Sequence, residues 1–394
     1  MTASDVVIVA AARTPQGRLK GQLAPFSAPQ LGAFAIRGAL ERGDIDPAQV
    51  DAVILGQVLS AGSGQNPARQ AAIGAGLAWD VPAHSVNKVC LSGLTAVIDA
   101  ARMIAVGDAK VVVAGGMESM TQAPHLLPAS RAGYSYGSIE VLDHMAHDGL
   151  TDAFDRESMG ASTERHNARF GLTRAQQDEV AAMSHRRAAA AKAQGVFDAE
   201  IVPVEVPQRK GEPVMLTRDE GVRPDTTVET LAGLRPAFAE GGTITAGNAS
   251  QISDGAAAVV LTTRAHATEQ GWPVLVAVGA SGQTAGPDNS LQAQPAQAIR
   301  RACDKQGIAP ADLDLVEINE AFGAVVAQSQ AELGLDAAVV NPHGGGIALG
   351  HPIGASGARL VVHAVHELAR RGAGTAAVAL CGGGGQGDAL ILTR

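Results

Sequence analysis

Two of the three cysteines in this 394-residue chain stand in surroundings that favour chemistry. Cys90 lies in the segment Val89–Gly93 (VCLSG), directly before apolar residues at helical spacing. The N-terminus of a helix favours a thiolate, and its free N–H groups can bind an oxyanion. A lone cysteine is more commonly a small buried hydrophobic residue. Cys90 is therefore a candidate nucleophile, with core packing as the alternative.

His351 stands in the glycine-rich segment Gly344–Gly357 (GGGIALGHPIGASG). Such a density of glycine lets the backbone approach a ligand closely, as in a phosphate-binding loop. However, the segment contains no lysine and matches neither GxxxxGK(S/T) nor GxGxxG. Acid–base chemistry by His351, held beside Pro352 ahead of a helix, is the better interpretation.

Two further candidates follow predicted strands. Cys381 comes after the apolar run Ala376–Leu380 and before a glycine-rich segment, Gly382–Gly387. That segment would either cradle a phosphate or place a backbone N–H at an active-site turn. Asn319 follows the run Leu315–Ile318, and polar residues at strand carboxyl ends are typical of α/β active sites.

Metal binding is not predicted. The histidines form two spaced pairs, His144 with His147 and His363 with His366. Neither pair has a third ligand at a convincing spacing, so surface or hydrogen-bonded histidines are the expected explanation.

An internal repeat indicates which elements position these residues. Ala35–Ala39 matches Ala298–Ala302, and Ile45–Val53 matches Ile308–Val316 at the same displacement along the chain. Ser92 and Gly93 match Ser356 and Gly357 at nearly the same displacement. The repeat predicts two copies of one fold, roughly residues 1–120 and 270–394.

Each copy alternates short apolar runs with helical patterns. This alternation predicts an α/β protein with mixed or parallel sheets covered by helices, stacked as a helix–sheet–helix–sheet–helix sandwich. Helical patterns span residues 94–105 and 360–368. The predicted strands are Val6–Ala11, Ala52–Leu55, Val111–Ala114, Val274–Val278, Leu315–Ile318 and Ala376–Leu380.

Residues 121–250 break this rhythm with prolines, glycines and one clear helical pattern near Arg174–Gln194. Long excursions of this kind are usually functional. The predicted domains are residues 1–120 with 251–271, a loop domain over 121–250, and residues 272–394.

Composition limits the partners and the compartment. A net charge of −9 with only 3% aromatic residues argues against nucleic acid, although it leaves room for an anionic ligand. No apolar run is expected to approach the roughly 18 residues of a membrane span. Val6–Ala12 lacks a preceding basic region and is expected to be a strand rather than a signal peptide. Sparse cysteines without a CxxC pair predict the reducing cytoplasm.

The motifs around these candidates resemble those of one family. Asn87–Gly93 resembles the nucleophile motif of the thiolases, and the likeness runs from Arg13 to the C-terminus in the family's order. It implies a duplicated five-layer α-β-α-β-α sandwich with an inserted loop domain. The other similar segments are Asn319–Phe322, Gly350–Gly354, Cys381–Gly384, Gly115–Met120 and Gly247–Ser250.

The resemblance implies a two-step acyl transfer that condenses two acetyl-CoA into acetoacetyl-CoA. Cys90 would carry the acyl group, and His351 would accept its proton and then help to bind an oxyanion. Asn319 would fix a water in that oxyanion site, and Cys381 would move the α-proton of the second acetyl-CoA. The N–H groups of Cys90 and Gly383 would stabilise the tetrahedral intermediate.

The same resemblance implies that coenzyme A thioesters are substrates and that no separate cofactor is needed. Met159 and Ser250 match positions that line the pantetheine channel, and Arg223 matches one near the nucleotide. Phe322 would lie near the reacting acyl group. A homotetramer is expected, as a dimer of dimers. Additional positive charge would come from Arg209, Lys210, Arg218 and Arg235, unless these are only surface charges.

Rival functions remain. The nearest is a degradative 3-ketoacyl-CoA thiolase with a longer acyl pocket, because three departures from the family lie near that pocket: Leu91, Ser158 and the segment Ser290–Pro295. Ketosynthase-type condensing enzymes resemble one another in a Cys-His-His set of active-site residues. This chain instead has Asn319 and a second cysteine, Cys381. A non-catalytic acyl-CoA-binding scaffold predicts a lost motif, and none is lost. A nucleotide-dependent dehydrogenase lacks its fingerprint.

Overall fold

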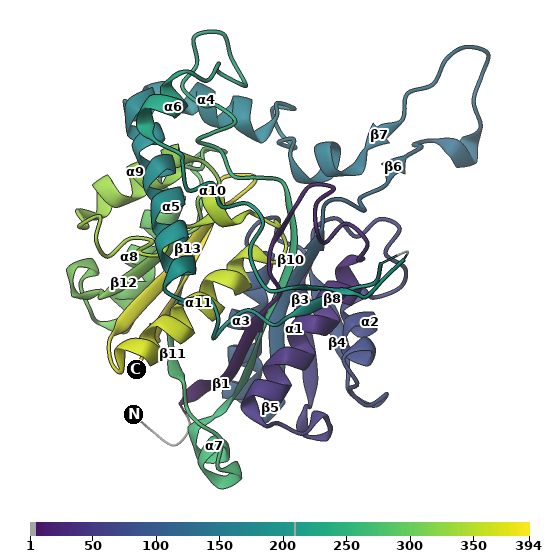
Figure 1. Ribbon diagram of the computed structural model, residues 1–394, viewed down its shortest axis with the longest axis vertical. Helices are drawn as coiled ribbons and strands as arrows, with labels where there is room; N and C mark the ends of the chain where they lie inside the picture. Colours follow the sequence, from purple (N-terminus) through teal and green to yellow (C-terminus); the bar gives the residue numbers. More distant parts are fainter. Residues whose placement is uncertain (1–4, 209) are drawn as a thin grey trace.

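The computed structural model describes residues 5–208 and 210–394 as a mixed α/β protein built on a ten-stranded sheet (Figure 1). The strand order is β12-β13-β14-β11-β1-β10-β5-β3-β4, and β2 pairs with β10. These strands are β1 (Val6–Arg13), β2 (Gly17–Arg18), β3 (Ala52–Gly56), β4 (Ala83–Val86), β5 (Val111–Ser119), β10 (Ser253–Thr263), β11 (Val276–Ala285), β12 (Leu315–Ile318), β13 (Thr375–Gly382) and β14 (Gln386–Thr393).

The sheet has two halves, which meet where β1 pairs with β11. In the first half β3 is parallel to both β4 and β5, and β10 runs antiparallel to β5 and β1. In the second half β12 is parallel to β13, and β14 runs antiparallel to β13 and β11. The junction consists of the residue pairs Val7–Ala277 and Ile8–Val276.

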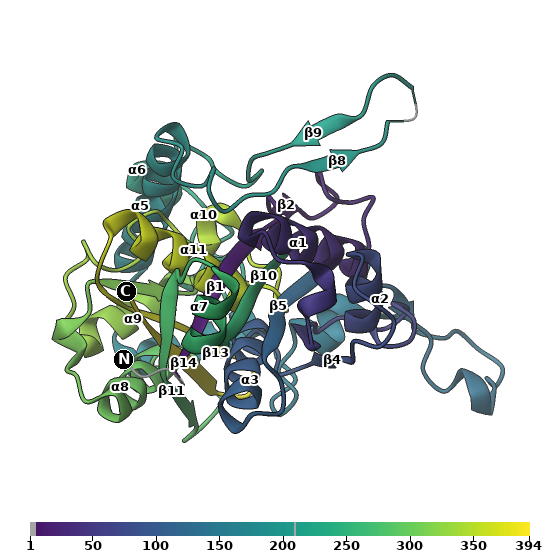
Figure 2. The same ribbon diagram turned by 90° about the horizontal axis from the view of Figure 1, so that it is seen from below.

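Helices cover the outer faces of both halves and also fill the space between them. α1 and α2 pack on the first half, whereas α8 and α9 pack on the second, at the opposite side of the molecule (Figure 2). α3 and α11 share one apolar core with strands of both halves. The bounds are α1 (Ala28–Gly43), α2 (Pro67–Gly74), α3 (Ser92–Val106), α8 (Gln294–Gln306), α9 (Gly323–Leu333) and α11 (Ser356–Arg371).

The position of α3 corrects one expectation from the sequence. The segment Val89–Val106 has the length and mean hydropathy of a membrane span, contrary to the expectation that no run approaches one. Leu94 and Val97 of this segment are buried between the two halves of the sheet, whereas Val106 at its C-terminal end is exposed. The high hydropathy therefore reflects a helix of the core.

Residues 121–250 leave the sheet and return to it through β10. The predicted helix near Arg174–Gln194 is confirmed as α5, which begins after a capping box formed by Thr173 and Gln176. An arm containing β6 and β7 projects from the body of the molecule (Figure 1). The elements here are β6 (His125–Leu126), β7 (Leu142–Asp143), a π-helical turn (Met145–Gly149), α4 (Met159–Phe170), α5 (Arg174–Ala193), β8 (Val204–Val206), β9 (Val214–Leu216) and α6 (Val228–Ala232).

Several predicted boundaries shift. Cys381 lies inside β13 rather than after it, because β13 pairs with β14 as far as Gly382 and the following glycines form the hairpin turn. β5 continues beyond the predicted end at Ala114 to Ser119 because it stays paired with β10. β11 begins at Val276 instead of Val274. Two further short helices are α7 (Arg264–Gln270), which follows β10, and α10 (Gly346–Leu349), which precedes α11.

Candidate active site

A constrained turn between β4 and α3 presents Cys90. Val89, a β-branched residue, has a φ of 51° in the left-handed region, a conformation that costs roughly 1–3 kcal/mol. Side chains on both sides hold it: Asn87 Oδ1 accepts from the Val89 N–H at 3.0 Å. Ser92 Oγ accepts from the Lys88 N–H at 2.8 Å and donates to the Val89 carbonyl at 2.6 Å. The turn is therefore fixed independently of any ligand.

An ion pair attaches this turn to the second half of the sheet. Lys88 Nζ lies 2.7 Å from Oδ1 and 2.9 Å from Oδ2 of Asp388 on β14. Asp388 is buried and also accepts from Thr95 Oγ1 at 2.8 Å. Because β14 is the hairpin partner of β13, the pair links the Cys90 turn to the strand that carries Cys381.

His351 lies in the turn between α10 and α11, with one ring nitrogen fixed by a serine. Its Nδ1 is 2.6 Å from Ser356 Oγ, and that hydroxyl donates to the Pro352 carbonyl at 2.9 Å. Since the only hydroxyl proton is used, Nδ1 must be the donor and Nε2 carries the lone pair. Burial, and secondarily the positive charge of Arg359, lowers the pKa of His351 to about 3. The imidazole is therefore neutral and has the form of a general base.

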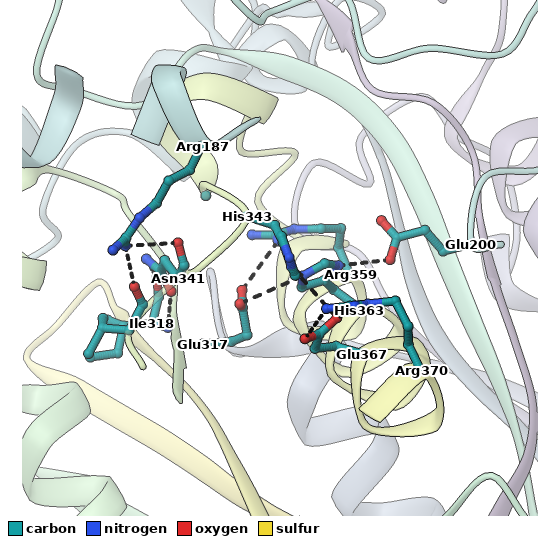
Figure 3. Close-up of polar contacts among 12 residues, drawn as sticks. Arg187, Glu200, Glu317, Ile318, Asn341, His343, Arg359, His363, Glu367 and Arg370 are labelled. Atoms are coloured by element: carbon teal, nitrogen blue, oxygen red, sulfur yellow. Dashed lines mark hydrogen bonds and ion pairs between the residues drawn. The ribbon is translucent and has the colours of Figure 1, made fainter. Parts of the chain in front are cut away.

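Asn319 follows β12 and faces the same imidazole. Its Nδ2 is 3.3 Å from His351 Nε2, and its Oδ1 makes no hydrogen bond within the described part of the chain. Asn341 holds the preceding residue, since it accepts from the Ile318 N–H at 2.8 Å and donates to the Ile318 carbonyl at 2.9 Å (Figure 3). A buried amide with a free oxygen suits the binding of a small polar group.

A cluster of buried charged residues lies near Ile318 and Asn341 (Figure 3). His363 Nδ1 is 2.9 Å from Glu200 Oε2, and Arg359 Nη1 is 3.8 Å from Glu317 Oε2. Burial lowers the pKa of His363, but the Glu200 and Glu317 carboxylates outweigh burial and raise that pKa above its ordinary value. The raised pKa favours the protonated form of His363, which joins α11 to Glu200, a residue of the excursion.

Seven of the predicted site residues line one narrow pocket with a volume of about 60 Å³. They are Cys90, His351, Cys381, Gly383, Met159, Ser250 and Phe322. The remaining wall is mostly apolar and comes from Val89, Gly149, Leu150, Leu291, Ala321, Ile353 and Gly382. The structure thus brings residues from all three predicted domains to one cavity.

Both thiols in the pocket are neutral at rest. Burial raises the pKa of Cys90 to about 12, and the backbone N–H groups of Cys90 and Gly383 only partly oppose this effect. Burial, followed by the proximity of Cys90, raises the pKa of Cys381 as well. Either thiol therefore needs a proton acceptor before it can react, and His351 is the neutral base in the same pocket.

Arg223 is not among the residues that line this pocket. Its backbone N–H donates to His185 Nδ1 at 3.1 Å, and its Nη2 is 3.4 Å from His185 Nε2. Lys210, Arg218 and Arg235 are likewise absent from the pocket wall, whereas Arg209 lies outside the described residues. Asn319 is buried behind the wall and contacts the pocket through His351.

Sequence reasoning overlooked Ser356 as a site residue, although the repeat contained a signal for it. Ser92 and Ser356 are the first residues of α3 and α11, and both hydroxyls donate to a carbonyl just before their helix.

The glycines that follow these two serines are required by the packing of the helices. A Cβ at Gly93 would lie 2.9 Å from the Ala358 nitrogen, and one at Gly357 would lie 2.4 Å from the Leu94 nitrogen. These glycines let the two helices meet at their N-termini.

Leu150 and Ile353 were also missed as pocket residues. Leu150 follows the π-helical turn, for which no sequence pattern gave a signal. Ile353 belongs to the Gly350–Gly354 motif, but only the fold shows that its side chain forms the wall. Leu291, noted as a departure from the family pattern, does line the pocket.

Comparison with known proteins gives full-length matches. Residues 6–265 match the family described as "Thiolase, N-terminal domain", and residues 272–394 match "Thiolase, C-terminal domain". The chain is 58% identical over 388 residues to the "Probable acetyl-CoA acetyltransferase" of Mycolicibacterium smegmatis, covering 98% of this chain and 100% of that protein. It is 53% identical over 391 residues to the "Acetyl-CoA acetyltransferase" of Pseudomonas aeruginosa, covering 99% of each chain. The protein of the same name from Cupriavidus necator is 50% identical over 392 residues, covering 99% of this chain and 100% of that protein.

Proposed function

This chain belongs to the thiolase family, and from that premise we propose that it is an acetyl-CoA acetyltransferase, which reversibly converts two acetyl-CoA into acetoacetyl-CoA and free CoA. One observation carries the proposal: Cys90, Cys381 and the neutral base His351 line the same narrow apolar pocket. One thiol can hold an acyl group while the second handles a proton, which this condensation requires.

In the first half-reaction Cys90 gives its proton to His351 Nε2, and its sulfur attacks the thioester carbonyl of acetyl-CoA. The carbonyl oxygen becomes an oxyanion, for which the N–H groups of Cys90 and Gly383 are the nearby donors. The CoA sulfur then leaves and takes the proton from His351. Acetyl-Cys90 and CoA are the products, and no net proton is gained or lost.

In the second half-reaction Cys381 first gives its proton to His351, and the resulting thiolate removes a proton from the α-carbon of a second acetyl-CoA. The carbanion attacks acetyl-Cys90, and the Cys90 sulfur leaves and takes the proton held by His351, so that both cysteines end as thiols. His351, protonated at this stage, would donate to the enolate oxygen of the second substrate together with a water fixed by Asn319, whose Nδ2 lies 3.3 Å from His351 Nε2. A second cysteine is needed because Cys90 is acylated when the α-carbon must be deprotonated.

We assign the CoA chain to the side of the pocket formed by Met159, Ser250 and Phe322. Gly160 supports this arrangement, because a Cβ there would lie 2.3 Å from the Phe238 ring, which packs edge-on against Phe322. Arg223 is assigned to the nucleotide end, outside the pocket. The short acyl group would occupy the space next to Leu291 and Leu150.

The pocket size tests the proposal against a degradative 3-ketoacyl-CoA thiolase. A volume of about 60 Å³ suits a short acyl group, and each misfitting methylene is worth about 10- to 200-fold in specificity. Thiolysis of acetoacetyl-CoA should therefore be faster by at least that factor than thiolysis of 3-ketooctanoyl-CoA. Leu291→Ala should raise the relative rate of the longer substrate. Equal rates for both substrates in the unmodified enzyme would support the degradative thiolase instead.

For the whole molecule we propose the five-layer sandwich of two repeated halves, with domains at residues 1–120 plus 251–271, 121–250 and 272–394. The packing of α3 and α11 between the halves supports it. A cytoplasmic homotetramer is the proposed assembly. The exposed apolar residues Tyr136, Ile139 and Val141 on the projecting arm support self-association. So does the outer edge of β4, which pairs with no further strand among the described residues.

A further inference from the structure

A buried carboxylate that does not line the pocket connects its two walls. Glu118 on β5 is completely buried and accepts three backbone hydrogen bonds. Its Oε2 accepts from the Val58 N–H and the Gly354 N–H, each at 3.0 Å. Its Oε1 accepts from the Leu59 N–H at 3.2 Å.

These donors come from different halves of the molecule. Val58 and Leu59 follow β3 in the first half, whereas Gly354 ends the turn that carries His351 into α11. The contact is tight: a Cβ at Gly354 would lie 2.7 Å from Glu118 Oε2, and a Cβ at Gly116 would lie 2.2 Å from the Gly354 carbonyl. The His351 turn therefore rests directly on β5.

The same residues shape the space around Cys90. Val58, Leu59 and Ile353 form one apolar cluster, and Cys90 packs against it. Ile353 is part of the pocket wall next to His351. Besides burial, the negative charge of Glu118 contributes to the raised pKa of Cys90. Glu118 thus acts on both reacting groups without touching the substrate pocket.

We propose that Glu118 is a positioning residue of this active site, whose carboxylate holds the His351 turn against the Val58–Leu59 loop and so fixes His351 and Ile353 relative to Cys90. The proposal rests on the thiolase function assigned above. It differs from a general structural role because the carboxylate has two separable effects: its shape orders the turn, and its charge opposes ionisation of Cys90.

Opposing effects determine the pKa of the Glu118 carboxyl group. Burial raises its pKa to about 7, with a further contribution from Asp254 on the neighbouring β10, while the three N–H donors oppose the rise. The neutral amide of Glu118→Gln removes the charge and replaces one acceptor by a donor that faces an N–H group. Glu118→Asp keeps the charge but is too short to reach both loops.

The test compares these two variants with Asp51→Asn. Asp51 is a matched control, since its Oδ2 accepts from the Lys110 and Val111 N–H groups at the opposite end of β5, at 2.7 and 2.9 Å. For each protein we would measure kcat and KM for acetoacetyl-CoA thiolysis. The rate of Cys90 carbamidomethylation would be followed against pH by peptide mass spectrometry.

Both Glu118 variants should lower kcat by about 10- to 100-fold, the cost of a small misplacement of a reacting group, with KM for CoA within about twofold. In Glu118→Gln the midpoint of Cys90 alkylation should move to lower pH, because a negative charge has been removed. In Glu118→Asp the midpoint should stay near that of the unmodified enzyme. Asp51→Asn should change neither quantity by more than about twofold.

An unchanged kcat in Glu118→Gln would overturn the proposal. So would a fall in kcat shared equally by Asp51→Asn. Cys303 is buried in the core on α8 and serves as a control for unfolding. If Cys303 is alkylated as fast as Cys90 in Glu118→Gln, that variant is unfolded, and the comparison is made with Glu118→Asp instead. If the unmodified protein lacked thiolysis the proposed function would fail, whereas the alkylation midpoints would still decide whether Glu118 acts on Cys90.

Discussion

The two cysteines of the pocket differ in their surroundings. Cys90 sits in a turn where the backbone N–H groups of Cys90 and Gly383 partly oppose the rise in its pKa, whereas Cys381 lies within β13 and its pKa is raised by burial and by Cys90 itself. The first environment suits a nucleophile that passes through a tetrahedral intermediate. The second suits a strong base that is formed only during the reaction, because a thiol with a raised pKa binds a proton tightly.

This difference predicts separate losses in two variants. Cys90→Ala should form no acyl-enzyme with acetyl-CoA, because no sulfur is left to attack the thioester. Cys381→Ser should still become acylated but lose condensation and thiolysis, since a hydroxyl group is a poor replacement for the thiolate base. Intact-protein mass spectrometry measures the acetyl adduct of each variant.

The matched control is Cys303→Ala, which alters the remaining cysteine outside the pocket and should keep both half-reactions. An acetyl group found on Cys90→Ala would reverse the assignment of the two thiols. Full condensation activity in Cys381→Ser would remove the need for a second cysteine.

His351 carries a further prediction at the residue scale. Its lowered pKa leaves it neutral at neutral pH, and Ser356 directs the lone pair to Nε2. His351→Asn should therefore slow acylation of Cys90 by roughly 10²- to 10⁴-fold, the usual contribution of a general base. The time course of the acetyl adduct at pH 7 measures it. Ser356→Ala keeps the imidazole but removes the hydroxyl that orients it, so it should slow acylation less than His351→Asn does. A larger decrease in Ser356→Ala than in His351→Asn would contradict this prediction.

At the scale of elements, the strongly patterned segments could be predicted from the sequence. β12 has the predicted bounds, and α5 and α11 contain the predicted helical patterns, because continuous apolar runs and helical spacing report burial directly. The repeated Ser-Gly pairs also marked the N-termini of α3 and α11. Cys90 and His351 stay predicted catalytic residues, and both line the same pocket.

The remaining features depend on contacts between distant segments. β5 extends to Ser119 because of its pairing with β10, and Leu150 reaches the pocket from an irregular turn. The role of Glu118 could not be predicted, since its hydrogen-bond donors lie on loops far away in sequence. The prediction that no apolar run approaches a membrane span was wrong for α3, whose high hydropathy comes from its position between the two halves of the sheet.

At the scale of the whole molecule, buried charges join the three parts of the chain. Arg13 on β1 is completely buried and pairs with Glu200 and Asp219, both in the excursion, at 2.7 Å each. Glu200 in turn meets His363 of α11 in the second half at 2.9 Å. Removing one partner from a buried ion pair typically costs about 3–5 kcal/mol, because the other charge is left without compensation.

This network predicts a stability difference that depends on pH. The pKa of His363 is raised in the folded protein by Glu200 and Glu317, despite burial. A group of this kind contributes stability that is fully present below its unfolded pKa of about 6.5 and is lost as the pH rises through the folded pKa. The free energy of unfolding of His363→Gln should therefore lie furthest below that of the unmodified protein in mild acid, and the gap should narrow at alkaline pH.

His366→Gln is the matched control on the same helix. Among the described residues, His366 makes no hydrogen bond to a carboxylate. Its Nε2 is 3.0 Å from the Ala11 carbonyl oxygen, and burial lowers its pKa. Folding then disfavours the protonated form, so acid should weaken the unmodified protein relative to this variant, which is the opposite slope. Urea denaturation between about pH 5.5 and 9 measures both differences. A gap for His363→Gln that stays constant across this range would mean that His363 binds no extra proton in the fold, and that Arg13 alone balances Glu200.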